Sequence, residues 1–233
     1  MSADPVWCLF RIEPSDVLNV SQAFNQAVER SQIAYQLQDY LKIRTKISNQ
    51  LPLQKLDESN IYFPDCLIER QQNPDVFDWE DLHQTYHLFS PKAFVEIFDN
   101  LFVGDTPIIS QRMSQAQLEL IITNRVCATE MLWGALGWQH ASKLPGYLGN
   151  MFVIPEDIAT VLATIEKIFT EINTDEFIQG AKSIGFRGNC NEDDAETIQS
   201  IILSCFRNVL QEGNGLLALS HPHIGIMPIP ENY

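Results

Sequence analysis

The apolar pattern changes within the first fifty residues, from a continuous run to a helical spacing. This change predicts a strand followed by a helix. Residues 6–12 (VWCLFRI) form a short apolar run rich in aromatic and β-branched side chains, a composition typical of a strand. From residue 17 onward, apolar side chains return every three or four positions, which is the spacing of one helix face. We expect this helix to end near Leu51, because a residue before proline is disfavoured in the helical region.

The middle of the chain carries two short helix patterns and one long apolar segment. We expect helices over 78–89 and 90–103, the second opened by a serine N-cap and a proline at its first position. Residues 60–68 contain a proline and fit either a short strand or an extended loop. The segment 114–138 is apolar around most of a helical circumference, so we predict a central apolar helix there that packs on several sides.

The last third of the chain alternates short apolar runs with amphipathic segments. In order, we expect a strand over 151–154, a helix opened by Pro155, a helix over 174–184 capped by Thr174, a helix from 191 or 192 to Gly213, and a strand over 216–219.

The whole pattern, about seven helices with a few short strands, predicts a predominantly helical α+β fold. The strands do not alternate regularly with the helices, which disfavours a doubly wound parallel sheet. No internal repeat and no low-complexity linker divides the sequence. We therefore expect 1–233 to form a single globular domain, with its weakest seam at 104–111.

Negative charge dominates the composition and excludes one class of partner. The chain holds 30 Asp and Glu against 15 Lys and Arg, a formal net charge of -15. Because affinity for nucleic acid rests largely on Lys and Arg contacts to phosphates, we expect no nucleic-acid partner. Most of the excess acid falls in 60–105 and 151–233. Such regions favour solubility or a basic protein partner.

The cysteines and the start of the chain indicate a compartment. The cysteines are odd in number and widely spaced, without a C-x-x-C pair, so we expect free thiols: Cys8, Cys66, Cys127, Cys190 and Cys205. No secretory leader pattern opens the sequence, and no run approaches the roughly 20 apolar residues of a membrane span. We therefore expect a soluble, cytoplasmic protein without a membrane partner.

Four of the five histidines fall in two close pairs, the sharpest hint of a metal site in the sequence. His83 and His87 share one face of an expected helix, about one turn apart. His221 and His223 point the same way if the chain stays extended through them. Either pair could supply two ligands to zinc or a similar metal.

Carboxylates next to the first histidine pair could complete such a site. Glu80 and Asp81 are the nearest acids. However, no glutamate is placed as in H-E-x-x-H, and the two pairs lie far apart in the sequence. The simpler interpretation is that these are surface or helix-end histidines. We therefore expect no cofactor, with zinc or a similar metal as the alternative.

A single carboxylate interrupts the most apolar stretch of the chain. Glu130 lies near Trp133 and Trp138 in the expected central helix. A desolvated carboxyl there would favour its neutral form, which suits general acid or base chemistry, and makes Glu130 a candidate catalytic residue. The simpler interpretation places Glu130 on the one solvated strip of that helix.

An acidic segment with interleaved aromatic residues is the candidate binding surface. Burying unpaired carboxylates is costly, so four acids within seven residues must be largely solvated. An aromatic side chain between them could anchor an interface while the acids steer a basic partner. The residues of this surface are Asp75, Asp78, Trp79, Glu80 and Asp81. In the alternative interpretation, Trp79 anchors the expected helix to the protein's own core and the acids complement the positive end of the helix dipole.

These observations predict an acidic interaction or regulatory protein without catalytic activity that binds a basic protein partner. A second acidic group, 192–196, adds to the predicted binding surface. The alternative is a metal-dependent enzyme or small-ligand binder that uses the histidine pairs or the Glu130 region. Stoichiometric metal in tag-free protein would favour the alternative, and steep salt dependence of partner binding would favour the interaction protein.

Overall fold

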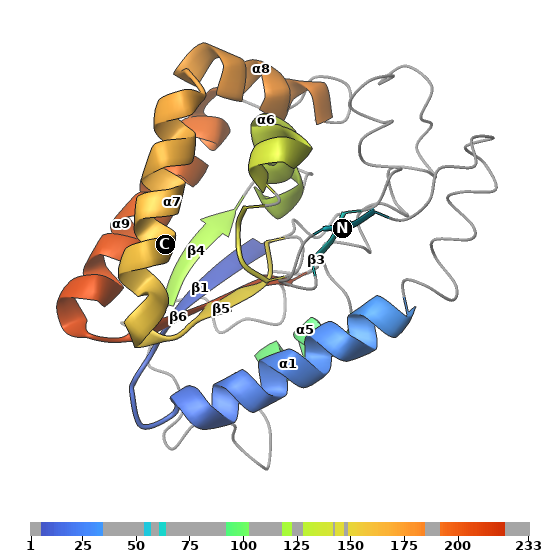
Figure 1. Cartoon of the computed structure of the whole chain (residues 1–233), viewed down its shortest axis with the longest axis vertical. Coiled ribbons are helices and arrows are strands. Elements are labelled where there is room, and N and C mark those ends of the chain that lie inside the picture. The colour runs from blue at the N-terminus through green and yellow to red at the C-terminus, as the bar shows by residue number, and fades with distance from the viewer. Residues whose placement is uncertain are drawn as a thin grey trace.

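The main sheet has four antiparallel strands and carries helices on both faces (Figure 1). The computed structural model describes residues 6–34, 54–56, 61–63, 92–102, 118–122, 128–141, 143–146, 149–184 and 192–221. The strand order is β4-β1-β6-β5. The strands are β1 (Val6–Ile12), β4 (Leu118–Ile122), β5 (Met151–Val153) and β6 (Gly215–His221).

Six α-helices and two further short strands complete the described part of the chain. The short strands, β2 (Gln54–Leu56) and β3 (Ile61–Phe63), pair with each other. Among the described helices, none is long and apolar enough to span a membrane. The helices are α1 (Val17–Ala34), α5 (Lys92–Phe102), α6 (Ala128–Ala141), α7 (Ile158–Glu171) with the short 3-10 helix η4 (Pro155–Asp157) before it, α8 (Thr174–Ile184) and α9 (Glu192–Glu212).

The two central strands join the beginning of the described chain to its end. β1 and β6 pair along their whole length, from Val6 opposite His221 to Ile12 opposite Gly215. Every residue of β6 is buried, and so is every residue of β1 except the half-buried Arg11. A strand covered on both faces needs apolar side chains at successive positions, which explains the continuous apolar runs in both strands.

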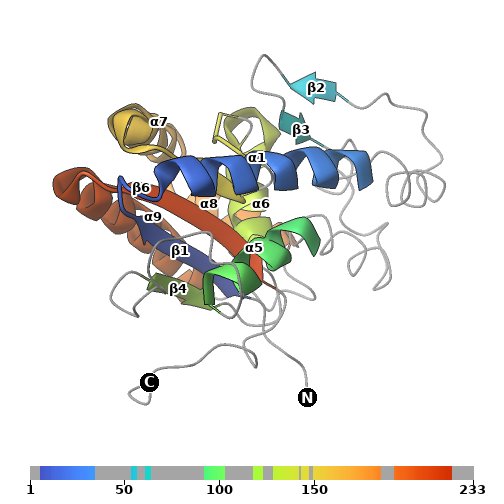
Figure 2. The same ribbon diagram turned by 90° about the horizontal axis from the view of Figure 1, so that it is seen from below.

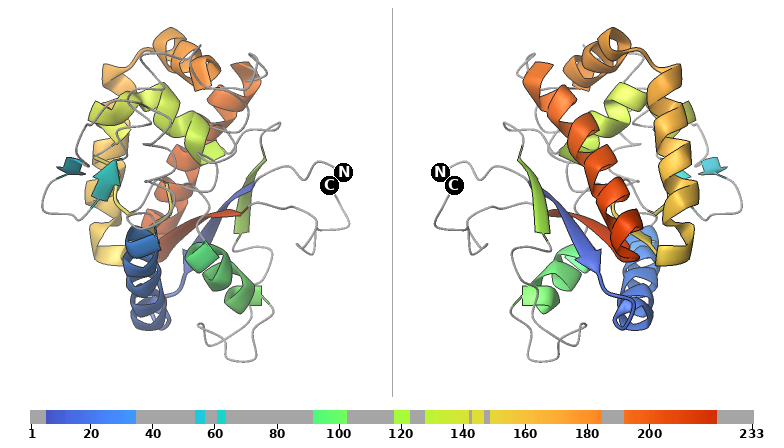
Figure 3. Two further views of the ribbon diagram at one scale, coloured as in Figure 1. Left: turned by 90° about the vertical axis from the view of Figure 1, so that its right-hand side faces the viewer. Right: turned by 90° about the vertical axis from the view of Figure 1, so that its left-hand side faces the viewer.

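Helices α1 and α5 cover one face of the sheet (Figure 3). Phe10 of β1 packs against Phe98 of α5, with ring centroids 5.9 Å apart. Phe24 of α1 lies 6.4 Å from Phe152 of β5 and 5.3 Å from Phe94 of α5, again between ring centroids. Aromatic contacts therefore attach both helices to the sheet and to each other.

Helices α6, α7 and α9 lie over the opposite face (Figure 2), and α8 packs against α6 farther from the sheet, at the top of Figure 1. Successive strand residues point to opposite faces, so Trp7 lies beneath these helices. It lines a small cavity together with Leu132 of α6, Ile165 of α7 and Ile202 of α9. The cavity measures about 10 Å³, about the space that one water molecule needs, and its lining is entirely apolar or aromatic.

The longest helix returns the chain to the sheet through a tight cap. α9 is followed by Gly213, whose φ of 70° lies in the left-handed region. The N–H of Asn214 then donates to the carbonyl of Val209 at 3.0 Å, as in a Schellman cap. The chain therefore enters β6 directly after α9.

The structure confirms the predominantly helical α+β fold class, with six described helices against about seven expected. β1, β5, α5, α8 and α9 lie where the hydrophobic pattern predicts them, and β6 is longer than expected at both ends. α1 is described as far as Ala34. Its predicted continuation to Leu51, the helix 78–89 and the seam 104–111 lie outside the described residues.

The predicted single central helix over 114–138 is wrong. Residues 118–122 form β4, which pairs antiparallel with β1, and α6 begins only at Ala128. A short run such as LELII fits the helix and strand patterns equally well. The open edge of β1 decides between them, because its backbone groups need hydrogen-bond partners. α6 is also broken at Gly137, whose φ of 67° and ψ of 160° are not helical.

The N-cap of α8 is Asn173 rather than the predicted Thr174. Oδ1 of Asn173 accepts a hydrogen bond from the backbone N–H of Glu176 at 2.8 Å. An N-cap side chain reaches the N–H two or three residues further on. Thr174 is therefore the first helical residue.

We expect the substitution Leu132→Ala to lower the free energy of unfolding by about 2 to 5 kcal/mol. The Leu132 side chain is 1% exposed and packs toward the sheet. The control Leu18→Ala, at a position of α1 that is 67% exposed, should change stability by less than about 0.5 kcal/mol. Urea unfolding measures both, and equal midpoints for the two variants would contradict a core position for α6.

Candidate functional site

Three buried polar side chains meet at one end of the sheet, beneath the start of α6. Thr129, Asn150 and Ser220 are each at most 1% exposed. Thr129 lies in the first turn of α6, Asn150 immediately precedes β5, and Ser220 lies near the end of β6. Polar groups buried this deeply need hydrogen-bond partners. These three residues form what we call the polar cluster, the candidate site of the described structure.

Hydrogen bonds join the polar cluster across long sequence distances. The backbone N–H of Ser220 donates to Oδ1 of Asn150 at 2.8 Å, and the hydroxyls of Thr129 and Ser220 lie 3.4 Å apart. Beside them, the indole N–H of Trp7 donates to the carbonyl of Gly149 at 3.1 Å. The ladder between β5 and β6 ends at Met151, so the Asn150 side chain supplies an acceptor where the ladder stops.

Two glycines shape the turn that places Asn150. Gly149 has a φ of 86°, and a Cβ there would lie 2.6 Å from Cγ2 of Thr129. Gly146 has a φ of 90°, and a Cβ there would collide with the backbone carbonyl of Asn150. Both positions require glycine for conformation and for space. The two glycines therefore allow the turn to bring Asn150 into the polar cluster.

The polar cluster can hold the backbone in place, but its side chains are one amide and two hydroxyls. Ser220 and His221 are neighbours in β6, yet successive strand residues face opposite sides of a sheet. His221 packs against Phe98 of α5 with ring centroids 4.5 Å apart, whereas Ser220 faces Thr129 of α6. Ser220 and His221 therefore do not form a nucleophile and general-base pair. We conclude that the polar cluster anchors the fold.

A charged cluster lies where β1, β4 and α9 meet. Nη1 of Arg11 donates to Oε1 of Glu212 at 2.9 Å, and Nη2 donates to Oε1 of Glu119 at 3.5 Å. Cys205 of α9 is 3% exposed, and the charges of Glu119 and Arg11 act on its thiol. Burial raises the pKa of the Cys205 thiol from 9.0 to about 12, the Glu119 charge adds to the rise and the Arg11 charge opposes it. The thiol is therefore neutral and unreactive near neutral pH.

The two cysteines that the structure describes lie outside any disulfide, in agreement with their wide spacing. Cys8 and Cys205 are both buried and form no disulfide. The other three lie outside the described residues: Cys66, Cys127 and Cys190.

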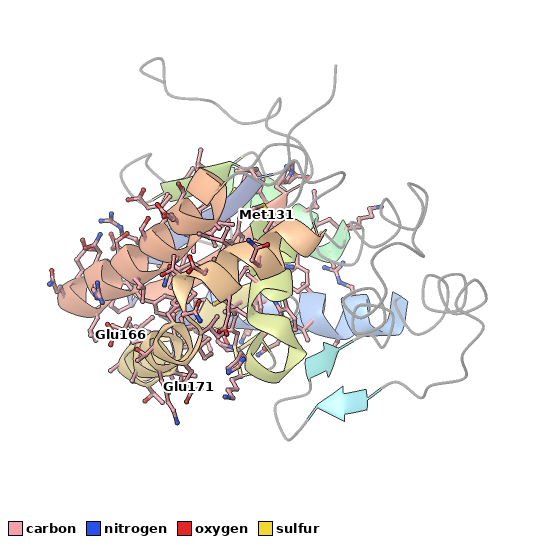
Figure 4. All side chains as sticks on the ribbon, turned by 90° about the horizontal axis from the view of Figure 1, so that it is seen from above. Met131, Glu166 and Glu171 are labelled. Atoms are coloured by element: carbon pink, nitrogen blue, oxygen red, sulfur yellow. The ribbon has the colours of Figure 1, made fainter. Side chains whose placement is uncertain are left out.

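The outer surface of α7 carries two ion-pair centres (Figure 4). Glu166 points toward α9, where Nη2 of Arg207 donates to its Oε1 at 2.7 Å. Glu171 points toward the end of α6, with its Oε2 3.5 Å from Nε2 of His140 and 3.8 Å from Nζ of Lys143. Ion pairs this exposed contribute little to stability. These pairs neutralise the described Lys and Arg side chains of this layer: Lys143, Lys167 and Arg207.

The structure describes one of the four predicted metal ligands. His221 ends β6 and is 1% exposed. His83, His87 and His223 lie outside the described residues, so the meeting of the two pairs stays untested. Among the side chains that the structure describes, no group of three or more His, Cys, Asp or Glu could hold a metal ion.

The other predicted site residues are described in part. Glu130 lies on α6, with its side chain outside the described set, and Trp133 nearby is buried. The group 192–196 forms the first turn of α9, where Glu196 is exposed. The predicted binding segment lies outside the described residues: Asp75, Asp78, Trp79, Glu80 and Asp81.

Nothing in the spacing of Thr129, Asn150 and Ser220 marks them as a cluster. In the sequence, Thr129 is a polar interruption of an apolar run, and Asn150 ends a glycine-rich turn. That turn is the one usable signal, because a Gly-Asn pair directly before a strand favours a specific backbone shape. Ser220, which donates its backbone N–H to Asn150 of this turn, lies 70 residues further along the chain.

Comparison of the chain with protein-family models, with curated proteins and with solved structures finds no match. The basis for a function is therefore the chemistry of this chain's own residues.

We expect the substitution Asn150→Ala to lower the free energy of unfolding by about 1 to 3 kcal/mol. The change leaves the buried N–H of Ser220 without its acceptor. The control Asn214→Ala removes a solvent-exposed hydrogen bond to Glu212 and should cost less than about 0.5 kcal/mol. Thermal or urea unfolding measures both, and similar losses for the two variants would show that the polar cluster is not needed.

We expect Cys205 to make stability fall in alkali. The folded pKa of about 12 lies above the ordinary value of 9.0, so the stabilising contribution is complete below pH 9 and is lost as the pH rises toward 12. Unfolding free energies measured across this range should fall more steeply for the wild type than for Cys205→Ala. Parallel curves would contradict the burial of this thiol.

Proposed function

We propose that this protein is a non-catalytic interaction protein that binds a basic protein partner through the acidic outer surface of α7, α8 and α9. The observation that carries the proposal is a set of exposed carboxylates on this helical layer. Within the described residues, none of them takes part in an ion pair. They are Glu156, Asp157, Asp175, Glu176 and Glu196.

The described basic side chains of this layer are already engaged. Arg207 pairs with Glu166, and both Lys143 and Lys167 approach Glu171 within 4 Å. The other exposed acids therefore leave a net negative surface. Such a surface attracts a basic partner over several ångströms and accelerates association at low salt.

The same acids also have a role inside their own helices. Asp175 and Glu176 lie in the first turn of α8, Glu196 near the start of α9, and Glu156 just before α7. Acids there complement the positive end of the helix dipole. This role affects stability and leaves partner binding unchanged, so the two roles can be separated by measurement.

The alternative, a metal-dependent enzyme or small-ligand binder, rests on sequence alone. Three of its four histidines and the Glu130 side chain lie outside the described residues. The described cavity is small and apolar, and the described polar cluster bonds to itself. The interaction protein is therefore proposed on its described exposed acids, and the alternative stays untested.

The proposal predicts that a lysine-rich synthetic peptide binds the protein and loses affinity as salt rises from about 50 to 300 mM. Neutralising Glu156→Gln, Asp175→Asn and Glu196→Gln together should weaken binding about tenfold. The matched control neutralises three exposed acids elsewhere, one before α1, one on α1 and one on α5. In that order, the substitutions are Glu13→Gln, Glu29→Gln and Asp99→Asn.

Fluorescence anisotropy of the labelled peptide measures all three proteins, with thermal melts to separate the helix-dipole effect. The control triple variant should bind within about twofold of the wild type. Equal weakening by both triple variants would mean that the peptide responds only to net charge, and it would overturn the α7–α9 surface as the binding site.

A further inference from the structure

One histidine joins the ends of two helices and faces an oxygen atom at each of its ring nitrogens. Nδ1 of His140 lies 3.2 Å from the backbone carbonyl oxygen of Leu136, which is four residues earlier in α6. Nε2 lies 3.5 Å from Oε2 of Glu171, the last residue of α7 (Figure 4). A carbonyl oxygen and an ionised carboxylate can only accept hydrogen bonds. The ring therefore needs a proton on each nitrogen to satisfy both contacts, and that form is the charged imidazolium.

Either neutral form of His140 leaves one of these contacts unfavourable. A neutral imidazole carries one N–H and one nitrogen lone pair. With the proton on Nδ1, the lone pair of Nε2 faces the carboxylate of Glu171. With the proton on Nε2, the lone pair of Nδ1 faces the carbonyl of Leu136. Loss of one proton therefore weakens the contact between the ends of α6 and α7.

Two lysines share the carboxylate that His140 contacts. Nζ of Lys143, which follows α6, lies 3.8 Å from Oε2 of Glu171, and Nζ of Lys167 lies 3.7 Å from Oε1. Their positive charges oppose a second proton on the imidazole, but both side chains are more exposed than that of His140 and are better screened by water. The lysines keep their charge at neutral pH, so His140 is the member of this group whose charge changes there.

Three further elements pack against α6, namely α8, α9 and β1. The charged residue of β1, Arg11, is engaged by Glu119 and Glu212. The described acids near the starts of α8 and α9 form no ion pair with His140 in the described part of the chain, and their negative charges favour the imidazolium. These acids are Asp175, Glu176 and Glu196.

The contact at His140 holds a turn that begins after a break in α6. The chain leaves helical geometry at Gly137, with φ of 67° and ψ of 160°. Beyond it, the N–H of Lys143 donates to the carbonyl of His140 and the N–H of Leu144 donates to the carbonyl of Ala141, both at 3.0 Å. Leu144 is 4% exposed and lines the apolar cavity. The contact therefore acts on one wall of that cavity.

We propose that His140 is a pH-dependent latch that holds the end of α6 and the following turn against α7 when it is protonated. The charged ring gains both contacts, so the latched state is favoured at low pH. It loses this advantage as the pH rises through the range of about 5 to 8, in which histidine loses its proton. The inference is independent of the proposed function, because His140 and Glu171 are not among the unpaired acids of the proposed binding surface.

Amide hydrogen exchange, measured by NMR, reports the opening of the latch at the N–H groups of Lys143 and Leu144. We expect their protection, corrected for the intrinsic pH dependence of exchange, to fall about threefold in the wild type between about pH 5.5 and pH 8. The N–H of Asn214, which donates to the carbonyl of Val209 after α9, is an internal control. Its protection should stay within about 1.5-fold.

Two variants test the latch from its two sides. His140→Gln and Glu171→Gln should each remove the pH dependence at both N–H groups. The matched control Glu166→Gln removes another carboxylate of α7 and should keep the pH dependence, because its partner Arg207 stays charged throughout this range. The latch is overturned by a pH dependence that is absent from the wild type, that survives either latch variant, or that is equally large at Asn214.

Discussion

Pairing between β1 and β6 creates the surface to which every other described layer attaches. The pair is central in the sheet, so both of its faces need cover, and the apolar side chains on both faces supply the driving force. α1 and α5 bury one face, and α6, α7 and α9 bury the other (Figure 3). β4 and β5 then extend the ladder by one strand on each side. If β6 were absent, β1 would lose its longest partner and both helical layers would lose their common support.

Polar groups divide between the interior and the surface according to their chemistry. The buried Thr129, Asn150 and Ser220 are uncharged and bond to each other or to backbone, so they stabilise without the cost of a buried charge. Most of the described carboxylates lie on the surface, where water screens them, and Asp16, just before α1, is the buried exception. In such a fold, surface side chains can change without disturbing the interior.

Residues whose structure depends on local pattern were predictable, and residues that depend on a distant partner were not. The run VWCLFRI is too short for a helix and apolar on both faces, so β1 follows from its sequence alone. LELII has the same local properties inside a longer apolar segment, and its strand depends on the edge of β1, more than a hundred residues earlier. Asn150 and Ser220 meet for the same non-local reason. The exposure of Glu196 follows from the helical period that buries Ile198 and Ile202.

The pairing of β1 with β6 also imposes an order of events during synthesis on the ribosome. β1 is translated first among the described elements, and its longest partner last, about 200 residues later. At typical elongation rates of about 5 to 20 residues per second, the nascent chain carries β1 without that partner for about 10 to 40 seconds. During that interval an apolar strand has no β6 edge to bind. The growing chain therefore offers a natural substrate for chaperones that recognise extended apolar segments.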